Sequence, residues 1–344
     1  MTVTESILAL VTSISTSIAT TSDLLRLLVL PVFAWAAVRD IKTRRIPSNI
    51  WLPLLIVGAI ALSLDALRLA PFDTFLGRLF LVQAGISLFF VAPLGYLFWR
   101  LGGFGGADAK ALITIAVILP TFPTYFIGTA AYPLVDTPTG VFSFTVLTNT
   151  VILAAVIPLS IFLYNAAQGR LSSQTIFARP VDVESLPDRH GRLFETQSGF
   201  TRNGLDLDAL RMYLRWRGMT LAELRSDPAQ HRDPATITET FEPTDGGTAV
   251  GPQTDGGVVE TKSDAVDNSA DDPWGAARFL EEIDGTAYGT TPAMLREGLE
   301  TIIDRDEIWV SPGFPFIVPM FLGLVVSFTY GDLLFGYLGW VGLF

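Results

Sequence analysis

The fold of this chain is decided by stretches such as residues 50–67, which read IWLPLLIVGAIALSLDAL. This stretch is apolar apart from one charged residue, Asp65. A helix needs about 20 mostly apolar residues to cross the hydrocarbon core of a bilayer, so the stretch predicts a transmembrane helix. Similar stretches recur before residue 166 and after residue 312, whereas the sequence between them is polar and charged. The pattern therefore predicts several membrane spans.

We expect an all-α, polytopic membrane fold with six transmembrane helices. The predicted spans lie roughly at residues 24–38, 50–67, 79–99, 109–132, 141–164 and 314–330. The predicted domains are an N-terminal segment (1–23), a membrane domain with helices 1–5 (24–165), an acidic insert (166–312) and a C-terminal transmembrane helix (313–344). The segment 1–23 has no Lys or Arg, and a secretory signal peptide needs a basic start, so we do not expect one. The last dozen residues are apolar enough to prolong the sixth span or to lie at the membrane interface.

Basic residues in the short loops predict the orientation of the chain. The loop 39–49 contains Arg39, Lys42, Arg44 and Arg45, and Arg100 and Lys110 flank the loop after the third span. Loops rich in Lys and Arg face the cytoplasm. We therefore expect both loops and the insert 166–312 on the cytoplasmic side of the cell membrane.

The insert carries most of the acidic residues behind the net charge of −11. Lysine is scarce, since Lys42, Lys110 and Lys262 are the only ones in the sequence. An acidic, lysine-poor surface suits a salt-rich, haloarchaeal-like cytoplasm, and an acidic, partly disordered segment of any other organism is the alternative.

Within the insert, apolar periodicity predicts helices around residues 205–216, 220–224, 279–283 and 294–303. Residues 227–273 are rich in Asp, Pro, Thr and Gly and predict a flexible linker.

The sequence contains no cysteine and two histidines, His190 and His231. Thiolate nucleophiles, disulfides and cysteine zinc sites are thereby excluded, and a histidine-rich metal site is not expected. We predict no metal and no organic cofactor.

Two aspartates are the candidate catalytic residues. Asp40 follows the first predicted span, and Asp108 precedes the fourth. The chain enters the cytoplasmic side before Asp40 and leaves it after Asp108, so both carboxyls are expected at the same depth on the same face. A pair of carboxyls in a partly dry site does not ionise twice easily. The charged member can take a proton from water, while the protonated member polarises a peptide carbonyl and later protonates the leaving amine.

Simpler roles for these residues stay open. Asp40 lies among basic residues and would fit an ion pair at a helix end, and Asp108 would fit a helix N-terminal cap. The residues Gly105, Gly106 and Ala107 permit a sharp turn and a close approach to another chain, or merely a turn. A transporter or a non-catalytic assembly protein with an acidic domain would also fit the spans and the insert.

The two sites resemble the motifs of one family. Residues 105–108, Gly-Gly-Ala-Asp, resemble the Gly-x-Gly-Asp motif of membrane aspartic proteases, with Ala107 in place of the last glycine. Residues 40–47, Asp-Ile-Lys-Thr-Arg-Arg-Ile-Pro, resemble the stretch after the first span of archaeal prepilin and preflagellin peptidases, up to and including Pro47. Residues 309–312, followed by an apolar span, also look like the C-terminal end of that family.

The resemblance implies an aspartic endopeptidase with Asp40 and Asp108 as its catalytic pair. Such enzymes remove the short basic leader of type IV prepilins, or of archaellin precursors, on the cytoplasmic side. The implied partners are these precursors and the lipid bilayer, with no nucleic acid. The resemblance covers residues 24–165 and 309–335, so it implies nothing about the insert, the oligomeric state or the choice between pilin and archaellin substrates.

Overall fold

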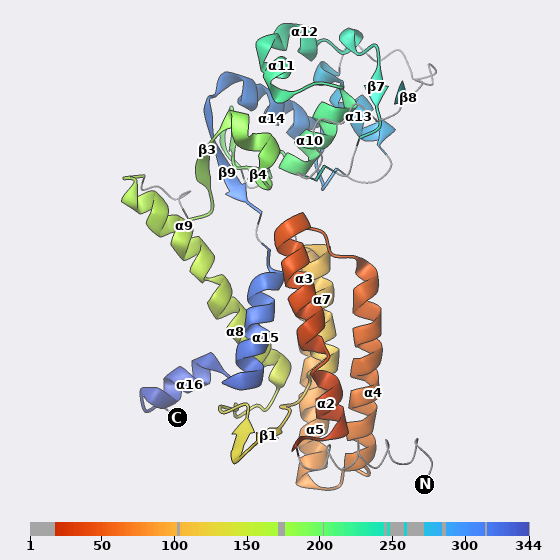
Figure 1. Cartoon of the computed structure of the whole chain (residues 1–344), viewed down its shortest axis with the longest axis vertical. Helices are drawn as coiled ribbons and strands as arrows, with labels where there is room; N and C mark the ends of the chain where they lie inside the picture. The colour runs from red at the N-terminus through yellow and green to blue at the C-terminus, as the bar shows by residue number, and fades with distance from the viewer. Residues whose placement is uncertain are drawn as a thin grey trace. The chain divides into compact units, whose positions relative to one another are not determined.

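The computed structural model describes residues 18–101, 104–170, 176–201, 203–243, 246–247, 258–259, 272–283, 287–313 and 315–343. The chain forms two compact units, one of Met1–Val156 with Pro315–Phe344 and the other of Ile157–Phe314. Most elements are helices, as predicted (Figure 1). The all-α prediction was nevertheless too simple, because short antiparallel strands occur in both units.

The first unit is a helical bundle with one small hairpin, β1–β2. Its described elements are α2 (Thr21–Arg26), α3 (Val29–Thr43), η1 (Ser48–Ile50), α4 (Trp51–Leu69), α5 (Phe75–Ile86), η2 (Ser87–Val91), α6 (Ala92–Arg100), α7 (Gly106–Ile118), β1 (Tyr125–Ile127), β2 (Ala130–Tyr132), α8 (Phe142–Ala154), α15 (Ile317–Thr329) and α16 (Leu333–Trp340).

Within the described residues, three helical stretches are long and apolar enough to cross a membrane. They are Ser48–Leu69, Phe75–Arg100 and Phe142–Ala167, and they coincide with the predicted second, third and fifth spans. The helix Ile317–Thr329, at the predicted sixth span, is apolar but shorter.

The predicted fourth span, residues 109–132, differs from the structure. Its helix α7 has 13 residues and ends at Ile118, and the hairpin of β1 and β2 follows. Pro120 and Pro123 lie in between, and proline has no N–H to continue a helix. At about 1.5 Å per residue, α7 covers roughly 20 Å, which is shorter than the hydrocarbon core of about 30 Å.

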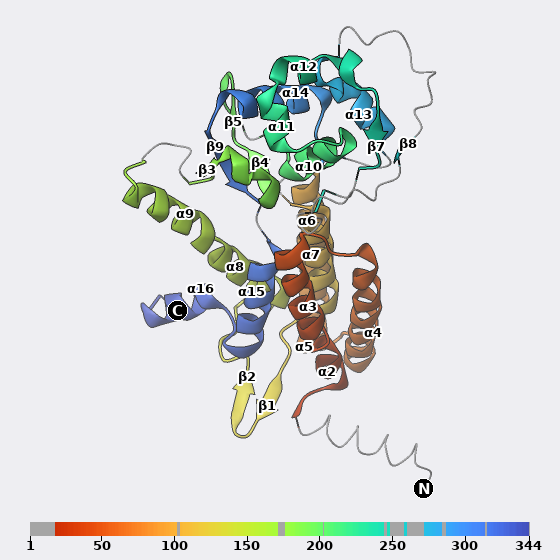
Figure 2. The same ribbon diagram turned by 45° about the horizontal axis from the view of Figure 1, so that its top comes forward.

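The helix α7 lies at the centre of the first unit (Figure 2). It packs against α4 and α6, while α15 packs against α3 and α8. Leu112, Ile115 and Ile118 of α7 are fully buried. On α4, Gly58 lets the two helices approach closely, because a Cβ atom there would lie 3.0 Å from the Cα of Ile118. The helix that carries Asp108 is therefore held on several sides by apolar neighbours.

The second unit combines a small sheet with short helices. Its described elements are α9 (Val156–Ala167, which starts in the first unit), β3 (Arg179–Asp182), η3 (Val183–Asp188), β4 (Gly191–Leu193), β5 (Glu195–Thr196), β6 (Gly199–Phe200), α10 (Leu207–Trp216), α11 (Leu221–Ser226), α12 (Pro228–Arg232), η4 (Pro234–Thr236), β7 (Thr240–Phe241), β8 (Val258–Val259), η6 (Pro273–Gly275), α13 (Ala276–Glu282), α14 (Pro292–Asp304) and β9 (Glu307–Pro312).

The last strand of this unit, β9, lies between its first, β3, and β4, and both pairings are antiparallel. The four predicted insert helices are confirmed as α10, α11, α13 and α14. Part of the predicted linker 227–273 is structured, since α12, η4 and β7 lie in it. Most of its remainder lies outside the described residues.

An aromatic cluster stabilises the second unit. Trp216, Trp274 and Phe279 are almost fully buried, and the rings of Trp216 and Phe279 have centroids 5.5 Å apart. The indole N–H of Trp274 donates to Glu300 and that of Trp216 to Glu282, so both buried donors are satisfied.

Candidate active site

Asp40 lies in the last turn of α3 and is 8% exposed. The helix stops at Thr43 because Arg44 adopts a left-handed conformation, with φ of 55°. The N–H of Arg44 donates to the backbone oxygen of Asp40 at 3.0 Å and closes this helix end. Pro47 directly precedes the short helix η1 as its N-cap residue. Asp40 therefore lies in a helix end that a backbone hydrogen bond closes.

Asp108 lies in the first turn of α7. Its carboxylate accepts a hydrogen bond of 3.1 Å from the backbone N–H of Gly105. A Cβ atom on Gly105 would lie 3.0 Å from the same carboxylate oxygen, so glycine leaves room for this contact. Gly106 has no such crowding, and Ala107 is half-buried. The N-cap residue of α7 is therefore Gly105 and not Asp108, while Asp108, three residues further on, accepts from the N–H of the cap. This helix-end contact does not exclude a second role.

The two aspartates lie close enough to act on each other electrostatically. Burial, and then the negative charge of Asp40, raise the pKa of Asp108 to about 7, although the Gly105 N–H and the charge of Arg44 lower it. Burial also raises the pKa of Asp40, against the lowering effects of Arg44 and of the backbone N–H of Ile317. Both residues lie just outside the predicted spans 24–38 and 109–132. The structure thus brings together the two residues that the sequence singled out.

A third part of the site comes from the start of α15, which the sequence did not single out. The backbone N–H of Ile317, the first residue of α15, faces the Asp40 carboxylate. The residue before Ile317 is Phe316, whose ring packs on the ring of Phe104 with the ring centroids 4.9 Å apart. Phe104 lies in the turn before Asp108 and also contacts Phe98 at 5.0 Å. The start of α15 therefore touches the surroundings of both aspartates.

A polar contact joins the two loops on the exposed side. The ammonium of Lys110 donates to the hydroxyl of Ser48 at 2.7 Å. Lys110 follows Asp108 on α7, and Ser48 opens η1 after Pro47. The segments that carry the two aspartates are thus linked by a side-chain hydrogen bond.

A separate ionic cluster lies at the opposite end of α7. Arg26 is 2% exposed and pairs with Asp23 at 2.8 Å and with Asp65 at 2.6 Å. Its Nε donates to the backbone oxygen of Ile118, which closes the C-terminal end of α7. Asp65, near the end of α4, thus has a buried cation as its partner.

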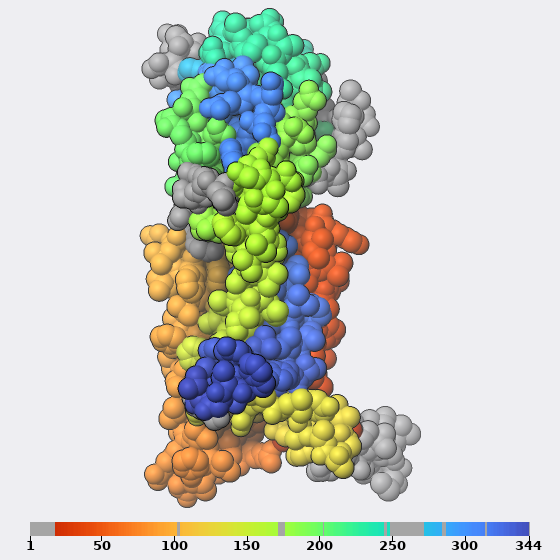
Figure 3. Space-filling view, turned by 90° about the vertical axis from the view of Figure 1, so that its left-hand side faces the viewer, coloured from red at the N-terminus to blue at the C-terminus, as the bar shows by residue number. Residues whose placement is uncertain are grey.

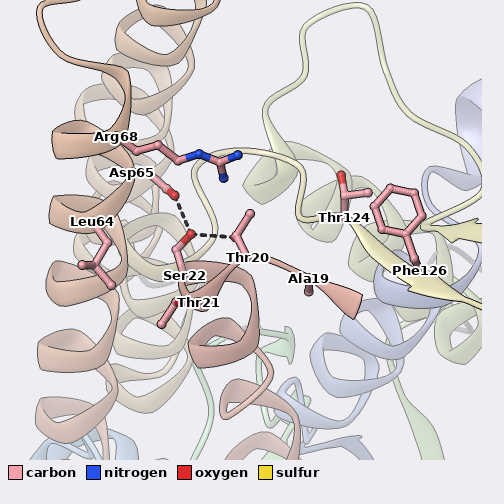
Figure 4. A pocket seen from close by; sticks show the side chains of 9 residues that line it. All are labelled: Ala19, Thr20, Thr21, Ser22, Leu64, Asp65, Arg68, Thr124 and Phe126. Carbon is pink, nitrogen blue, oxygen red and sulfur yellow. Dashed lines mark hydrogen bonds between the residues drawn. The ribbon is translucent and has the colours of Figure 1, made fainter. Parts of the chain in front are cut away.

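A recess lies beside this cluster, and Figure 4 shows the side chains that line it, with Ser22 bonded to Asp65. Neither Asp40 nor Asp108 lines it. Because Asp23, Arg26 and Asp65 satisfy one another, the cluster stabilises the bundle. Among the described residues, no group of three or more Asp, Glu and His side chains is arranged to hold a metal ion.

Comparison with known proteins gives two family matches and one curated relative. Residues 27–163 match the model of the Type IV leader peptidase family, and residues 253–333 match the model "Archaeal Peptidase A24 C-terminus Type II". The chain is 32% identical over 138 residues to a preflagellin peptidase of Methanococcus voltae. The matched stretch covers 39% of this chain and 54% of that protein. The chain thus matches only about half the length of this relative. No solved structure matches.

Proposed function

The chain belongs to the type IV leader peptidase family, and we propose that it is a membrane aspartic endopeptidase with Asp40 and Asp108 as its catalytic pair. The observation that carries this proposal is the electrostatic coupling of two carboxyls in a largely buried place. Asp108 has a pKa raised to about 7, partly by the charge of Asp40, so a large fraction of it carries a proton near pH 7, unlike an ordinary aspartate. A simple cap or a surface ion pair does not need a second carboxyl beside it.

In the proposed reaction, ionised Asp40 takes a proton from a water molecule, whose oxygen attacks the peptide carbonyl carbon. Asp108 gives its proton to the carbonyl oxygen, so the intermediate is an uncharged diol. Asp108 has then lost its proton, so Asp40, rather than the initially protonated member as first expected, passes its proton to the amide nitrogen as the C–N bond breaks. Asp108 takes one hydroxyl proton of the diol back. Both carboxyls return to their starting states, and the reaction uses only water and the two aspartates.

The division of roles follows from the neighbours of each carboxyl. The Arg44 guanidinium and the Ile317 N–H both lower the pKa of Asp40 and so favour its charged form. For Asp108, burial and the nearby charge of Asp40 are the largest effects, and both favour the protonated form. We therefore assign Asp40 as the base and Asp108 as the acid.

The proposed substrates are prepilin-like or archaellin precursors, whose leader would be cut at the cytoplasmic edge of the membrane. The family match and the similarity to a preflagellin peptidase support this substrate class. The proposed topology has six crossings, of which the fourth consists of the shorter helix α7 and the segment that follows it. It places the loops of Asp40 and Asp108 and the insert 166–312 in the cytoplasm, and the basic loops support this orientation.

The direct test is cleavage of a co-expressed prepilin-like precursor by wild type, Asp40→Asn and Asp108→Asn, with membrane levels checked. Asparagine keeps the shape of aspartate but cannot exchange a carboxyl proton. Cleavage by wild type, with both variants inserted normally but at least about 1,000-fold slower, supports the proposal. Asp65→Asn is a control for loss of a carboxyl elsewhere in the same unit and should still cleave.

Near-normal cleavage by Asp40→Asn or Asp108→Asn would make that aspartate structural and sink the catalytic assignment. If wild type cleaves neither a prepilin nor an archaellin leader, a transporter or a non-catalytic assembly protein becomes the better account.

A further inference from the structure

The helix α16 near the C-terminal end is an apolar element that the described part of the chain leaves largely uncovered. None of its 8 residues is buried, and no charged residue occurs from Leu333 to Leu343. Trp340 is 82% exposed and Tyr337 is 59% exposed, and their rings lie on one side of the helix with centroids 6.2 Å apart. In Figure 3 this helix lies on the surface that faces the viewer, in the darkest blue.

A tight turn separates α16 from α15, so the last helix does not prolong the predicted sixth span. The chain turns at Gly331, whose φ is 104°, and a Cβ atom there would lie 1.9 Å from the backbone oxygen of Val135. The N–H of Val135 donates to Tyr330 at 2.8 Å, and the N–H of Asp332 donates back to Val135 at 3.2 Å. The Asp332 carboxylate then caps α16 by accepting from the N–H of Phe335 at 3.0 Å.

One buried side chain, Asn149 of α8, holds this turn in place. Its amide nitrogen donates to the hydroxyl of Ser327 and to the backbone oxygen of Gly331, both at 2.8 Å. Its amide oxygen accepts from the N–H of Leu333 at 2.9 Å. Hydrogen bonds of both the nitrogen and the oxygen of the Asn149 amide thus fix the direction in which α16 leaves the bundle.

An uncovered apolar helix of this length needs an apolar solvent. At about 1.5 Å per residue it covers only about 12 Å, which is far too short to cross a bilayer. A single short helix is also marginal in water unless it packs an apolar face. The neighbouring helices α15 and α8 also expose apolar side chains, and α8 belongs to a stretch long enough to cross the membrane. These side chains are Leu322, Val325, Val151 and Ile152.

We propose that α16 lies in the lipid bilayer, roughly parallel to its surface, in the half of the bilayer farther from Asp40 and Asp108, about 20 Å along α15 from them. The polar connection of residues 133–140, which bonds to the turn through Val135, lies at the water boundary. Tyr337 and Trp340 turn their O–H and N–H groups toward the lipid head groups, as interfacial aromatics do. Since α15 runs from Ile317 beside Asp40 to this turn, an anchored α16 sets the depth of Asp40 in the membrane.

The absence of cysteine from the chain permits a direct test. Leu334→Cys and Trp340→Cys each create a single site for a nitroxide spin label, in the full-length protein reconstituted in phosphatidylcholine vesicles. Collision of the label with oxygen, which concentrates in lipid, and with a polar nickel chelate, which stays in water, reports the surroundings. Met320→Cys, buried in the bundle, and Glu184→Cys, exposed on the second unit, are the matched controls.

The proposal expects frequent collisions with oxygen and few with the chelate at position 334, and the reverse at position 184. Frequent collisions with the chelate at position 334 would place α16 in water and overturn the proposal. Few collisions with either reagent, as expected at position 320, would mean that protein covers α16, for instance a second copy of the chain, and would also overturn it.

A second measurement avoids the labels. Bromines placed on the lipid chains near the head groups should quench tryptophan fluorescence of wild type more than that of Trp340→Phe. Trp216→Phe, at a buried position of the second unit, should not reduce the amount of tryptophan fluorescence that the bromines quench. Equal quenching of wild type and Trp340→Phe would contradict the proposal.

Discussion

Phe104 and Phe316 are 212 positions apart in the chain, yet their rings pack with centroids 4.9 Å apart and planes inclined by 40°. Phe104 belongs to the turn that precedes Asp108, and Phe316 directly precedes the helix whose first N–H faces Asp40. This ring contact therefore couples the position of α15 to the positions of both carboxyls.

Replacing Phe316 by leucine should slow leader cleavage about tenfold or more at normal membrane levels. Leucine keeps apolar volume but loses the ring contact, and about 1 Å of misplacement in an active site costs on the order of 100-fold in rate. Cleavage of a prepilin-like precursor, measured as kcat and KM, checks this. The loss should appear mainly in kcat, because the substitution disturbs the carboxyls rather than the substrate.

Phe90→Leu is the matched control, because Phe90 and Phe144 form a similar ring pair at 5.6 Å elsewhere in the same unit. Phe104→Leu should slow cleavage as Phe316→Leu does, and the double variant should be little worse than either single one. Equal loss in Phe90→Leu, or fully additive losses in the double variant, would mean that the ring contact has no special role.

Cleavage by the wild type should decline above about pH 7. The proposed acid, Asp108, has a pKa raised to about 7, chiefly by burial, and must carry a proton to act. Raising the pH above this value removes the proton, so kcat/KM falls. Acidification that protonates Asp40 should lower the rate as well and produce a bell-shaped profile. A rate that stays constant from pH 6 to pH 9 would contradict the assignment of Asp108.

Arg44→Gln should move the alkaline limb of this profile to higher pH. The Arg44 guanidinium lowers the pKa of both aspartates, so its removal raises both and lets Asp108 keep its proton at higher pH. Lys42→Gln, an exposed residue on the same loop, is the control and should leave the limb in place. A limb that stays in place, as in Lys42→Gln, would show that the charge of Arg44 does not act on the pair, and a shift to lower pH would contradict the sign of its effect.

The two aspartates were predictable because their placement depends on topology alone. A span that ends at the cytoplasmic side and another that begins there bring Asp40 and Asp108 to one face, whatever the packing. Phe316 and Ile317 were not predictable in the same way. Their part in the site arises from the packing of α15 against α3, and nothing in the local sequence of an apolar helix start indicates its neighbours.

The errors in the predicted fold have local physical causes. Hydropathy alone extended the fourth span to residue 132, although Pro120 and Pro123 end the helix earlier. The ion pair of Asp65 with Arg26 was not predicted, because the two residues lie 39 positions apart and only tertiary structure brings them together. In the insert, the spacing of apolar residues was sufficient to predict the helices α10 and α14. Strands of two or three residues are too short to show an alternating pattern in the sequence.

Arg26→Met should destabilise the first unit strongly. The variant would leave the carboxylates of Asp23 and Asp65 without their buried cation, which costs about 3–5 kcal/mol in comparable cases. Thermal unfolding in detergent would show this as a lower midpoint. Arg26→Met combined with Asp65→Asn should regain part of the loss, because one unpaired charge is removed.

Arg68→Met is the matched control for that experiment. Arg68 lies less than one turn from Asp65 on α4 but is exposed, so its loss should change stability by no more than about 0.5 kcal/mol. If Arg26→Met and Arg68→Met unfold alike, the ionic cluster contributes little and the packing around it carries the stability.

Gly323→Ala should push α15 away from α8. A Cβ atom at Gly323 would lie 2.6 Å from the hydroxyl oxygen of Thr150 and 2.9 Å from its backbone nitrogen. The second contact is with backbone, so side-chain rotation cannot relieve it, and overpacking of this kind costs about 1–3 kcal/mol. Thermal unfolding in detergent should show the loss.

Gly85→Ala provides the comparison, because a Cβ atom at Gly85 on α5 would meet nothing within 4 Å. Alanine is the better helix former by about 0.5–1 kcal/mol, so this variant should be as stable as wild type or more stable. Thr150→Ala should rescue Gly323→Ala only in part, since it removes the hydroxyl contact and leaves the backbone contact. A complete rescue would mean that the backbones of α8 and α15 are farther apart than the structure has them, and that Asn149 alone determines where α15 ends.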